Sequence, residues 1–179
     1  KIAQLMNLDY PGGPALEKAA KSGDPNRFDL PRPLKGRQGC DLSFSGLKTA
    51  ARITFQSLKD RTQKDINDVA ASFQLAVVES LLNRAEHAVH MISSSVQHFV
   101  IAGGVAANQM LRGQLVELCA RHGLTFIAPP VSLCTDNAAM IAWAGIERFS
   151  VGYTSSLDVT PKPRWPLSAM KPLNIINNL

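Results

Sequence analysis

The second half of the chain alternates short apolar segments with helical patterns, and this alternation restricts the fold more than any other feature. Segments 97–102 and 124–128 have the length and apolar character of buried strands. A helical pattern follows each of them, at 106–122 and from about 136 to 149. Strands that alternate with helices at this spacing predict an α/β fold in which crossover helices connect an open sheet.

A long amphipathic helix precedes the first strand. Its apolar side chains recur every three or four residues, at Ile66, Val69, Ala70, Phe73, Val77, Leu81, Ala85, Ala88 and Ile92. Thr62 lies three residues before Asp65 and is a suitable N-cap. We therefore expect one uninterrupted helix that ends near residue 92.

Shorter elements are expected on either side of these regions. The sequence predicts helices at 1–8, 15–23 and 45–60, and two short extended segments at 26–34 and 40–46. The tail, 152–179, contains four prolines and is expected to lie extended over the surface.

Composition indicates a soluble domain with a real core, because 45% of the 179 residues are hydrophobic. No apolar run reaches the roughly 18 residues of a membrane helix, and no secretory signal is recognisable, so we expect a cytoplasmic protein without a membrane partner. Cys40, Cys119 and Cys134 lack metal-ligand spacing and are interpreted as reduced structural thiols. The chain begins with Lys1 in the middle of a helical pattern, so we expect a piece of a larger protein.

Positive charge is concentrated in residues 17–65. This segment holds eleven Lys and Arg side chains against six acidic ones, which accounts for the whole formal net charge of +5. Such a surface suits a polyanion such as RNA or an acidic protein partner, and an ordinary solvated surface is the alternative.

Two strand-to-helix turns carry the candidate site residues. Gly103 and Gly104 end the first strand, and Asn108 follows beside the free N–H groups of a helix, a suitable place for phosphate or ribose oxygens. Tight packing of strand on helix is the alternative explanation for the glycines. In the second turn Asp136 is either a helix N-cap or a carboxylate ligand of a cation. Both turns follow the carboxyl ends of strands, where open α/β sheets bind ligands.

The histidines offer a weaker pattern. His87 and His90 are three residues apart on the long helix, which places two ligands on one side, but no third ligand is at hand in the sequence. We therefore expect no metal there, and we interpret His98 and His122 as surface residues.

Five motifs occur in one order, at 10–14 (YPGGP), 41–49 (DLSFSGLKT), 102–112 (AGGVAANQMLR), 134–145 (CTDNAAMIAWAG) and 163–167 (PRWPL). With these motifs the chain resembles the tRNA threonylcarbamoyladenosine transferase family (TsaD, formerly Gcp), in its bacterial and mitochondrial branch, from residue 1 to about 167.

The resemblance implies an actin/Hsp70-like (ASKHA) nucleotide-binding fold of the α/β class. Residues 1–151 would form its C-terminal lobe, with a helical portion at about 45–95, and 152–179 would be an extended tail. It also implies transfer of a threonylcarbamoyl group from threonylcarbamoyl-AMP to the exocyclic amine of the adenosine next to the anticodon, in tRNAs that read codons beginning with A. TsaB and TsaE are the partner proteins that it implies.

The resemblance assigns roles to individual residues. Asp136 matches a metal ligand, and Gly13 and Asn108 match positions that contact the adenylate, for which Gly103 and Gly104 make room. Two histidines from an N-terminal half outside this sequence would complete a site for iron(II) or zinc. No side chain is expected to act as a covalent catalyst, because the anhydride is already activated, and this piece alone is expected to be inactive.

Two other functions remain open at this point. One is a metal-dependent glycoprotein endopeptidase, which would need a general base beside its metal. The other is a non-catalytic nucleotide-binding scaffold, which would have no use for the Asp136 carboxylate as a ligand.

Overall fold

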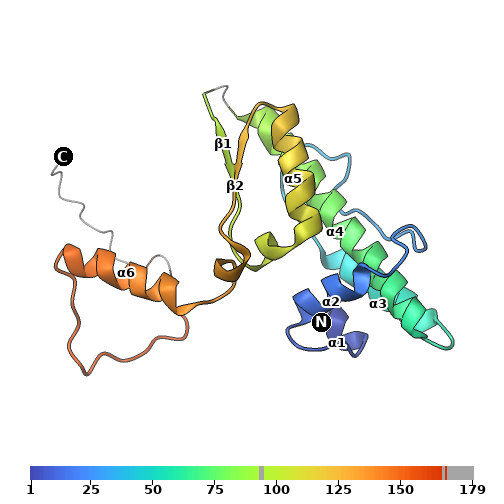
Figure 1. The fold of residues 1–179 in the computed structure, drawn as a ribbon, viewed down its shortest axis with the longest axis horizontal. Coiled ribbons are helices and arrows are strands. Elements are labelled where there is room, and N and C mark those ends of the chain that lie inside the picture. The colour runs from blue at the N-terminus through green and yellow to red at the C-terminus, as the bar shows by residue number, and fades with distance from the viewer. Residues whose placement is uncertain (93–94, 167, 169–179) are drawn as a thin grey trace. The chain divides into compact units, whose positions relative to one another are not determined.

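The computed structural model describes residues 1–92, 95–166 and 168 (Figure 1). These residues form two compact units, Lys1–Asp136 and Asn137–Leu179, and each is described separately. The predicted division at residue 151 stays a prediction.

The first unit begins with four helices. They are α1 (Ile2–Leu5), α2 (Gly12–Ala20), α3 (Ser45–Ser57) and α4 (Gln63–Met91). Thr62 caps α4 as predicted, in a reciprocal capping box with Asp65. All four helical regions that the sequence indicates before the first strand are confirmed. The two extended segments at 26–34 and 40–46 form no strand in the described chain, because neither pairs with another segment.

The main core lies where α2 and α3 pack against the first half of α4. Its fully buried residues include Met6, Leu47 and Val69. The same region buries the carboxylate of Asp68, whose side chain is only 1% exposed. Asp68 accepts hydrogen bonds from the backbone N–H of Asp24, from Arg27 and from Lys64, so the loop after α2 is tied to α4.

The second part of this unit contains a small parallel sheet. Strand β1 (His98–Val100) pairs with β2 (Thr125–Ile127), and α5 (Gln109–Arg121) connects them. This crossover between parallel strands is the α/β arrangement that the alternating pattern predicts, with strands shorter than expected. A single turn of 3₁₀ helix, Gly104–Ala107, precedes α5, so the α-helix begins later than the predicted residue 106.

Helices α4 and α5 lie side by side and run in the same direction (Figure 1). A hydrogen bond joins Gln74 of α4 to Asn108 at the start of α5. Farther along, Glu86 of α4 approaches His122 at the end of α5. A second apolar cluster, which includes Val78, Leu111 and Leu115, fills the contact between them.

The second unit contains α6 (Ala138–Ser150), close to the predicted 136–149. Its large apolar side chains, Trp143 and Phe149 among them, are exposed within the described chain. The described part of the tail forms neither an α-helix nor a strand, while Pro172 and the end of the PRWPL motif lie outside the described residues. Among the residues that the structure describes, no helix has both the length and the apolarity to span a membrane.

Candidate functional site

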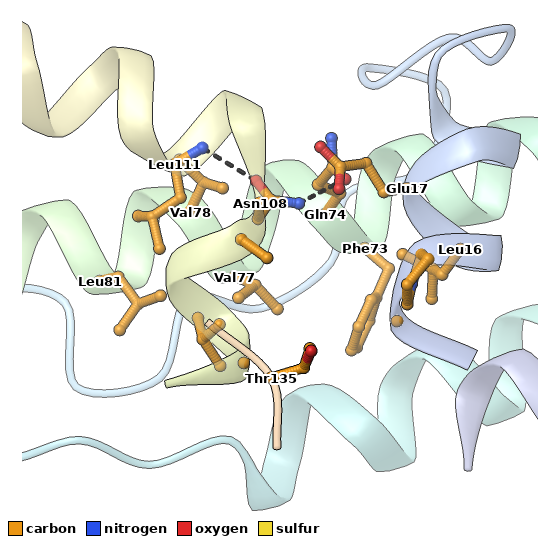
Figure 2. A pocket seen from close by; sticks show the side chains of 15 residues that line it. Leu16, Glu17, Phe73, Gln74, Val77, Val78, Leu81, Asn108, Leu111 and Thr135 are labelled. Carbon is orange, nitrogen blue, oxygen red and sulfur yellow. Dashed lines mark hydrogen bonds between the residues drawn. The ribbon is translucent and has the colours of Figure 1, made fainter. Parts of the chain in front are cut away.

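A cavity of about 540 Å³ lies in the first unit, between the start of α2, the middle of α4 and the turn that leads into α5 (Figure 2). Phe73, Val77 and Leu81 of α4 form an apolar wall. Gly13, Gly104 and Asn108 line it from three separate segments. The structure thus brings together three of the four residues that the resemblance places near the adenylate.

Asn108 is the N-cap of α5, and its side chain is held on both sides. Its Oδ1 accepts a hydrogen bond from the backbone N–H of Leu111 at 2.9 Å, and its Nδ2 donates to Gln74 Oε1 at 3.0 Å. These two bonds fix the amide at the edge of the cavity, as Figure 2 shows. One N–H and one lone pair of the amide remain for other contacts.

The carboxylate of Glu17, in α2, also reaches this edge of the cavity. Glu17 Oε1 accepts a hydrogen bond at 2.8 Å from the backbone N–H of Gln109, the first residue of α5. A carboxylate at a helix N-terminus stabilises the positive end of the helix dipole. Glu17 therefore already pairs with the N–H of Gln109, one of the helix N-terminal groups that we expected to be free to bind an anion.

Gly103 and Gly104 are explained by different structural requirements. Gly103 has φ +82° and ψ 179°, a conformation that is essentially restricted to glycine. Gly103 does not line the cavity, whereas Gly104 does. A Cβ at either position would meet no described atom within 4 Å, so tight packing of strand on helix does not explain this pair. Backbone conformation explains Gly103, and Gly104 leaves open space beside the cavity.

Gly13, in the first turn of α2, is open in the same way. A Cβ there would meet nothing within 4 Å, whereas one at the preceding Gly12 would come within 2.9 Å of Ala3 Cβ. Gly12 is thus required by packing, and Gly13 leaves space at the cavity mouth.

Asp136 ends the segment whose Thr135 lines the cavity. The N-cap of α6 is Asn137, whose Oδ1 accepts from the backbone N–H of Met140 at 3.0 Å. The alternative that Asp136 is the cap is therefore wrong. Its carboxylate is exposed and has no ion pair or hydrogen bond among the described residues, so it is available as a ligand.

A second hollow adjoins the cavity and shares Gly13, Leu16 and Phe73 with it. Lys48 and Ser45 of α3 line its far side. An apolar wall with a cation next to it is a combination that suits a nucleotide, because the base is apolar on its faces and the phosphate is anionic.

Part of the basic charge of residues 17–65 is neutralised within the chain. Arg27 pairs with Asp65 and Asp68, Arg32 with Asp29 and Glu79, and Lys64 with Asp68. The other eight basic side chains of this segment form no ion pair with described residues. The basic surface is therefore smaller than the sequence count suggests, but it persists.

The histidines are arranged differently from the sequence expectation. His90 lies against His122, with ring centroids 5.1 Å apart, and Glu86 is the third member of the group. Within the described residues this is the one group of three potential ligands whose ligand atoms all lie within 4.8 Å of one another. Spacing along one helix pointed to His87 as the partner of His90. The actual partner lies 32 residues farther along the chain, which no local pattern reveals.

Comparison with known proteins identifies a family. A family model described as tRNA N6-adenosine threonylcarbamoyltransferase matches residues 1–143. Proteins named tRNA N6-adenosine threonylcarbamoyltransferase from Paramagnetospirillum magneticum, Bartonella tribocorum and Sinorhizobium medicae are 53%, 54% and 54% identical to it, over 93%, 93% and 94% of this chain. The chain spans about half the length of these curated relatives, 49% in each case. This chain belongs to the tRNA N6-adenosine threonylcarbamoyltransferase family.

Proposed function

We propose that this chain forms the C-terminal part of a tRNA threonylcarbamoyltransferase. The whole enzyme moves the threonylcarbamoyl group from threonylcarbamoyl-AMP to the exocyclic amine of the adenosine next to the anticodon, in tRNAs that read codons beginning with A. The observation that carries this proposal is the cavity in which Gly13, Gly104 and Asn108 of this family member meet.

In this proposal, residues of the cavity and of the hollow beside it contact the base, the ribose and the phosphate from one side of the adenylate. The wall formed by Phe73, Val77 and Leu81 offers apolar contact to the adenine base. Asn108, oriented by Gln74, offers a donor and an acceptor to the ribose or the base edge. Lys48 in the adjoining hollow offers positive charge to the phosphate. In this proposal the chain is the C-terminal lobe of an actin/Hsp70-like fold, and the other lobe closes the site.

Positioning is the main catalytic contribution of these residues. The mixed carbamic–phosphoric anhydride is already activated, so the protein needs to hold it in line with the adenosine amine rather than attack it. The bond that forms joins that amine to the carbamoyl carbon. The bond that breaks releases AMP.

Asp136 fits the role of a metal ligand, because its carboxylate is exposed and does not cap α6. One carboxylate together with two imidazoles from the N-terminal half suits iron(II) or zinc. Such an ion would supply polarisation of the donor's carbonyl or phosphate.

The eight basic side chains of residues 17–65 that are unpaired within the described chain support tRNA as the second substrate. TsaB and TsaE belong to the same proposal as partner proteins. The proposed enzyme acts in the cytoplasm, where its tRNA substrate is found.

The experiment joins this chain to the N-terminal half of the Bartonella tribocorum relative. Threonylcarbamoyl-AMP, unmodified tRNA and the partner proteins are added, and the modified nucleoside is measured by mass spectrometry. We expect product from the joined protein and none from the 179-residue chain alone. A folded joined protein that makes no product but cleaves a glycoprotein would favour the endopeptidase, and one that only binds nucleotide would favour the scaffold.

An Asp136→Ala variant of the joined protein tests the metal ligand. We expect loss of tRNA modification of at least about 100-fold, since a ligand matters more than the outer-shell partners whose loss costs 10–100-fold. The matched control is Asp60→Ala, another exposed aspartate, which should modify tRNA at the normal rate. Normal modification by the Asp136→Ala variant would refute this role.

A further inference from the structure

The cluster formed by Glu86, His90 and His122 does not include Asp136, and the proposed transfer reaction does not use it. Glu86 and His90 are four residues apart in the last turns of α4, so they project from the same side of that helix. His122 is the C-cap residue of α5. The parallel course of α4 and α5 brings the two helix ends to one place.

One distance within this cluster is already that of a metal site. His122 Nε2 and Glu86 Oε1 are 3.5 Å apart. Zinc bound tetrahedrally at 2.0–2.1 Å holds its ligand atoms about 3.4 Å apart, so this pair already has the required spacing. His90 is exposed, and its ligand nitrogen lies within 4.8 Å of the other two ligand atoms, so its side chain needs to move closer to complete the set.

The ring geometry points the same way. The imidazoles of His90 and His122 have an interplanar angle of 83° and centroids 5.1 Å apart. Two imidazoles bound to one tetrahedral ion place their centroids at about 5 Å, because each ring extends directly behind its ligand nitrogen. An edge-to-face ring pair, with Glu86 bonded to His122 and paired with Arg121, is the alternative arrangement without an ion.

The helix ends provide an electrostatic reason for a cation at this place. The carboxyl ends of α4 and α5 carry partial negative charge from the aligned peptide dipoles of each helix, and the two ends are adjacent. Arg121 brings a positive side chain to the cluster, with Nη2 3.9 Å from Glu86 Oε1. Its side chain is 65% exposed, so it is free to turn away into solvent when an ion binds.

We propose that Glu86, His90 and His122 bind one Zn²⁺ ion, with water in the fourth position, and that this ion clamps the ends of α4 and α5 together. Two imidazole nitrogens and one carboxylate oxygen are a donor set that zinc accepts readily. The clamp is structural: it fixes His122, the point at which the chain leaves α5 for β2.

The test uses the 179-residue chain and zinc chloride. Isothermal titration calorimetry should give one ion per chain, and the melting temperature should rise with zinc concentration because the ion binds the folded state. Substitution of a ligand, in His90→Gln, His122→Gln or Glu86→Gln, should weaken binding by more than the roughly 10–100-fold that loss of an outer-shell partner costs. Absence of zinc binding by the wild-type chain would overturn the proposal.

His87→Gln and His98→Gln are the matched controls. His87 directly follows Glu86 on α4, and His98 is an exposed histidine of β1, yet neither belongs to the cluster. Both variants should bind zinc with wild-type affinity. Wild-type affinity in the His90→Gln variant, whose altered side chain is exposed and outside the core, would overturn the proposal even if the other two ligand variants failed to fold.

The visible absorption spectrum of bound cobalt(II) distinguishes a site at this cluster from a site formed by other residues of the chain. Cobalt bound to nitrogen and oxygen gives visible bands but no thiolate charge-transfer band, which would appear if Cys40, Cys119 or Cys134 held the ion. An Asp136→Ala variant should retain the wild-type cobalt spectrum. A thiolate band, or loss of the spectrum in the Asp136→Ala variant, would assign the ion elsewhere and overturn the proposal.

Discussion

The two ends of the α4–α5 pair present opposite chemistry. Where α5 begins, backbone N–H groups of its first turn donate hydrogen bonds to the side chains of Asn108 and Glu17 beside an apolar cavity. Where α4 and α5 end, His122 lies against a carboxylate of α4 and an imidazole. The start of a helix attracts negative charge and its end attracts positive charge. In our proposals, one pair of parallel helices therefore offers one end to an adenylate and the other to a cation.

The ends also differ in how firmly the described chain fixes them. Near the cavity, the first half of α4 is anchored by the buried Asp68 and by the core around Leu47 and Val69. At the far end Leu118 and Cys119 of α5 are buried as well, but the cluster residues Glu86, His90 and His122 are half-buried or exposed, and the hydrogen bond between Glu86 and His122 is long, at 3.5 Å. We therefore expect substitutions near the cavity to act on folding, and substitutions of the three cluster residues to act mainly through the proposed ion.

The largest effect is expected from Asp68→Ala. The substitution leaves the backbone N–H of Asp24 without its acceptor and removes the common partner of Arg27 and Lys64. We expect the free energy of unfolding to fall by about 2–4 kcal/mol in urea titrations. Asp60→Ala, at an exposed position, should change it by less than about 0.5 kcal/mol. Equal effects of the two substitutions would show that the buried network does not anchor α4.

Acid should weaken the same anchor more gently, because a protonated Asp68 keeps part of its hydrogen bonding. Burial raises the pKa of Asp68, but hydrogen bonds from Lys64, the Asp24 backbone and Arg27 outweigh it and lower the pKa to about 2. An aspartate in the unfolded chain titrates near about 3.9. The stabilisation of the folded state by the ionised Asp68 carboxylate is therefore complete above about pH 3.9 and is lost as pH falls through about 2. Urea titrations from neutral pH downward should show a steeper loss for the wild type than for Asp68→Asn, and parallel curves would contradict this.

A smaller effect on stability is expected from substitutions of Asn108. Two substitutions distinguish its role as helix cap from its proposed role in positioning the adenylate. Asn108→Ala removes the cap of α5 and should cost about 1 kcal/mol in the free energy of unfolding. Asn108→Ser keeps an oxygen for the N–H of Leu111 but loses the hydrogen bond to Gln74, so most of the stability should return. Adenylate binding by the joined protein should remain weakened in both variants. Full binding by the Ser variant would show that the Gln74 contact does not matter for the ligand.

Periodicity and capping rules predicted much of the fold. The repeat of apolar residues located α4, and Thr62 was correctly predicted as its cap because the capping box is encoded within four residues. The start of α6 was harder, because Asp136 and Asn137 are both good N-caps and only the backbone of the folded chain selects Asn137.

The candidate sites depend on contacts between distant segments, and sequence patterns reveal only their separate parts. Gly104 and Asn108 were proposed from the strand-to-helix turn and Gly13 through the resemblance, but the wall of Phe73 and Val77 depends on the packing of α4 beside them. The same holds for His122, whose proximity to His90 depends on the parallel course of two helices. Local spacing favoured His87 instead, since a helical pattern contains no information about neighbouring helices.

The uninterrupted length of α4 makes it a molecular ruler. Gln74 at the cavity and Glu86 in the histidine cluster are twelve residues apart on this one helix, which corresponds to about 18 Å along its axis. A paramagnetic ion such as cobalt(II) bound to the cluster would lie within range of nuclear magnetic resonance effects on a nucleotide in the cavity. Relaxation of the adenine protons would then report where the base lies, measured from a fixed origin in the protein itself.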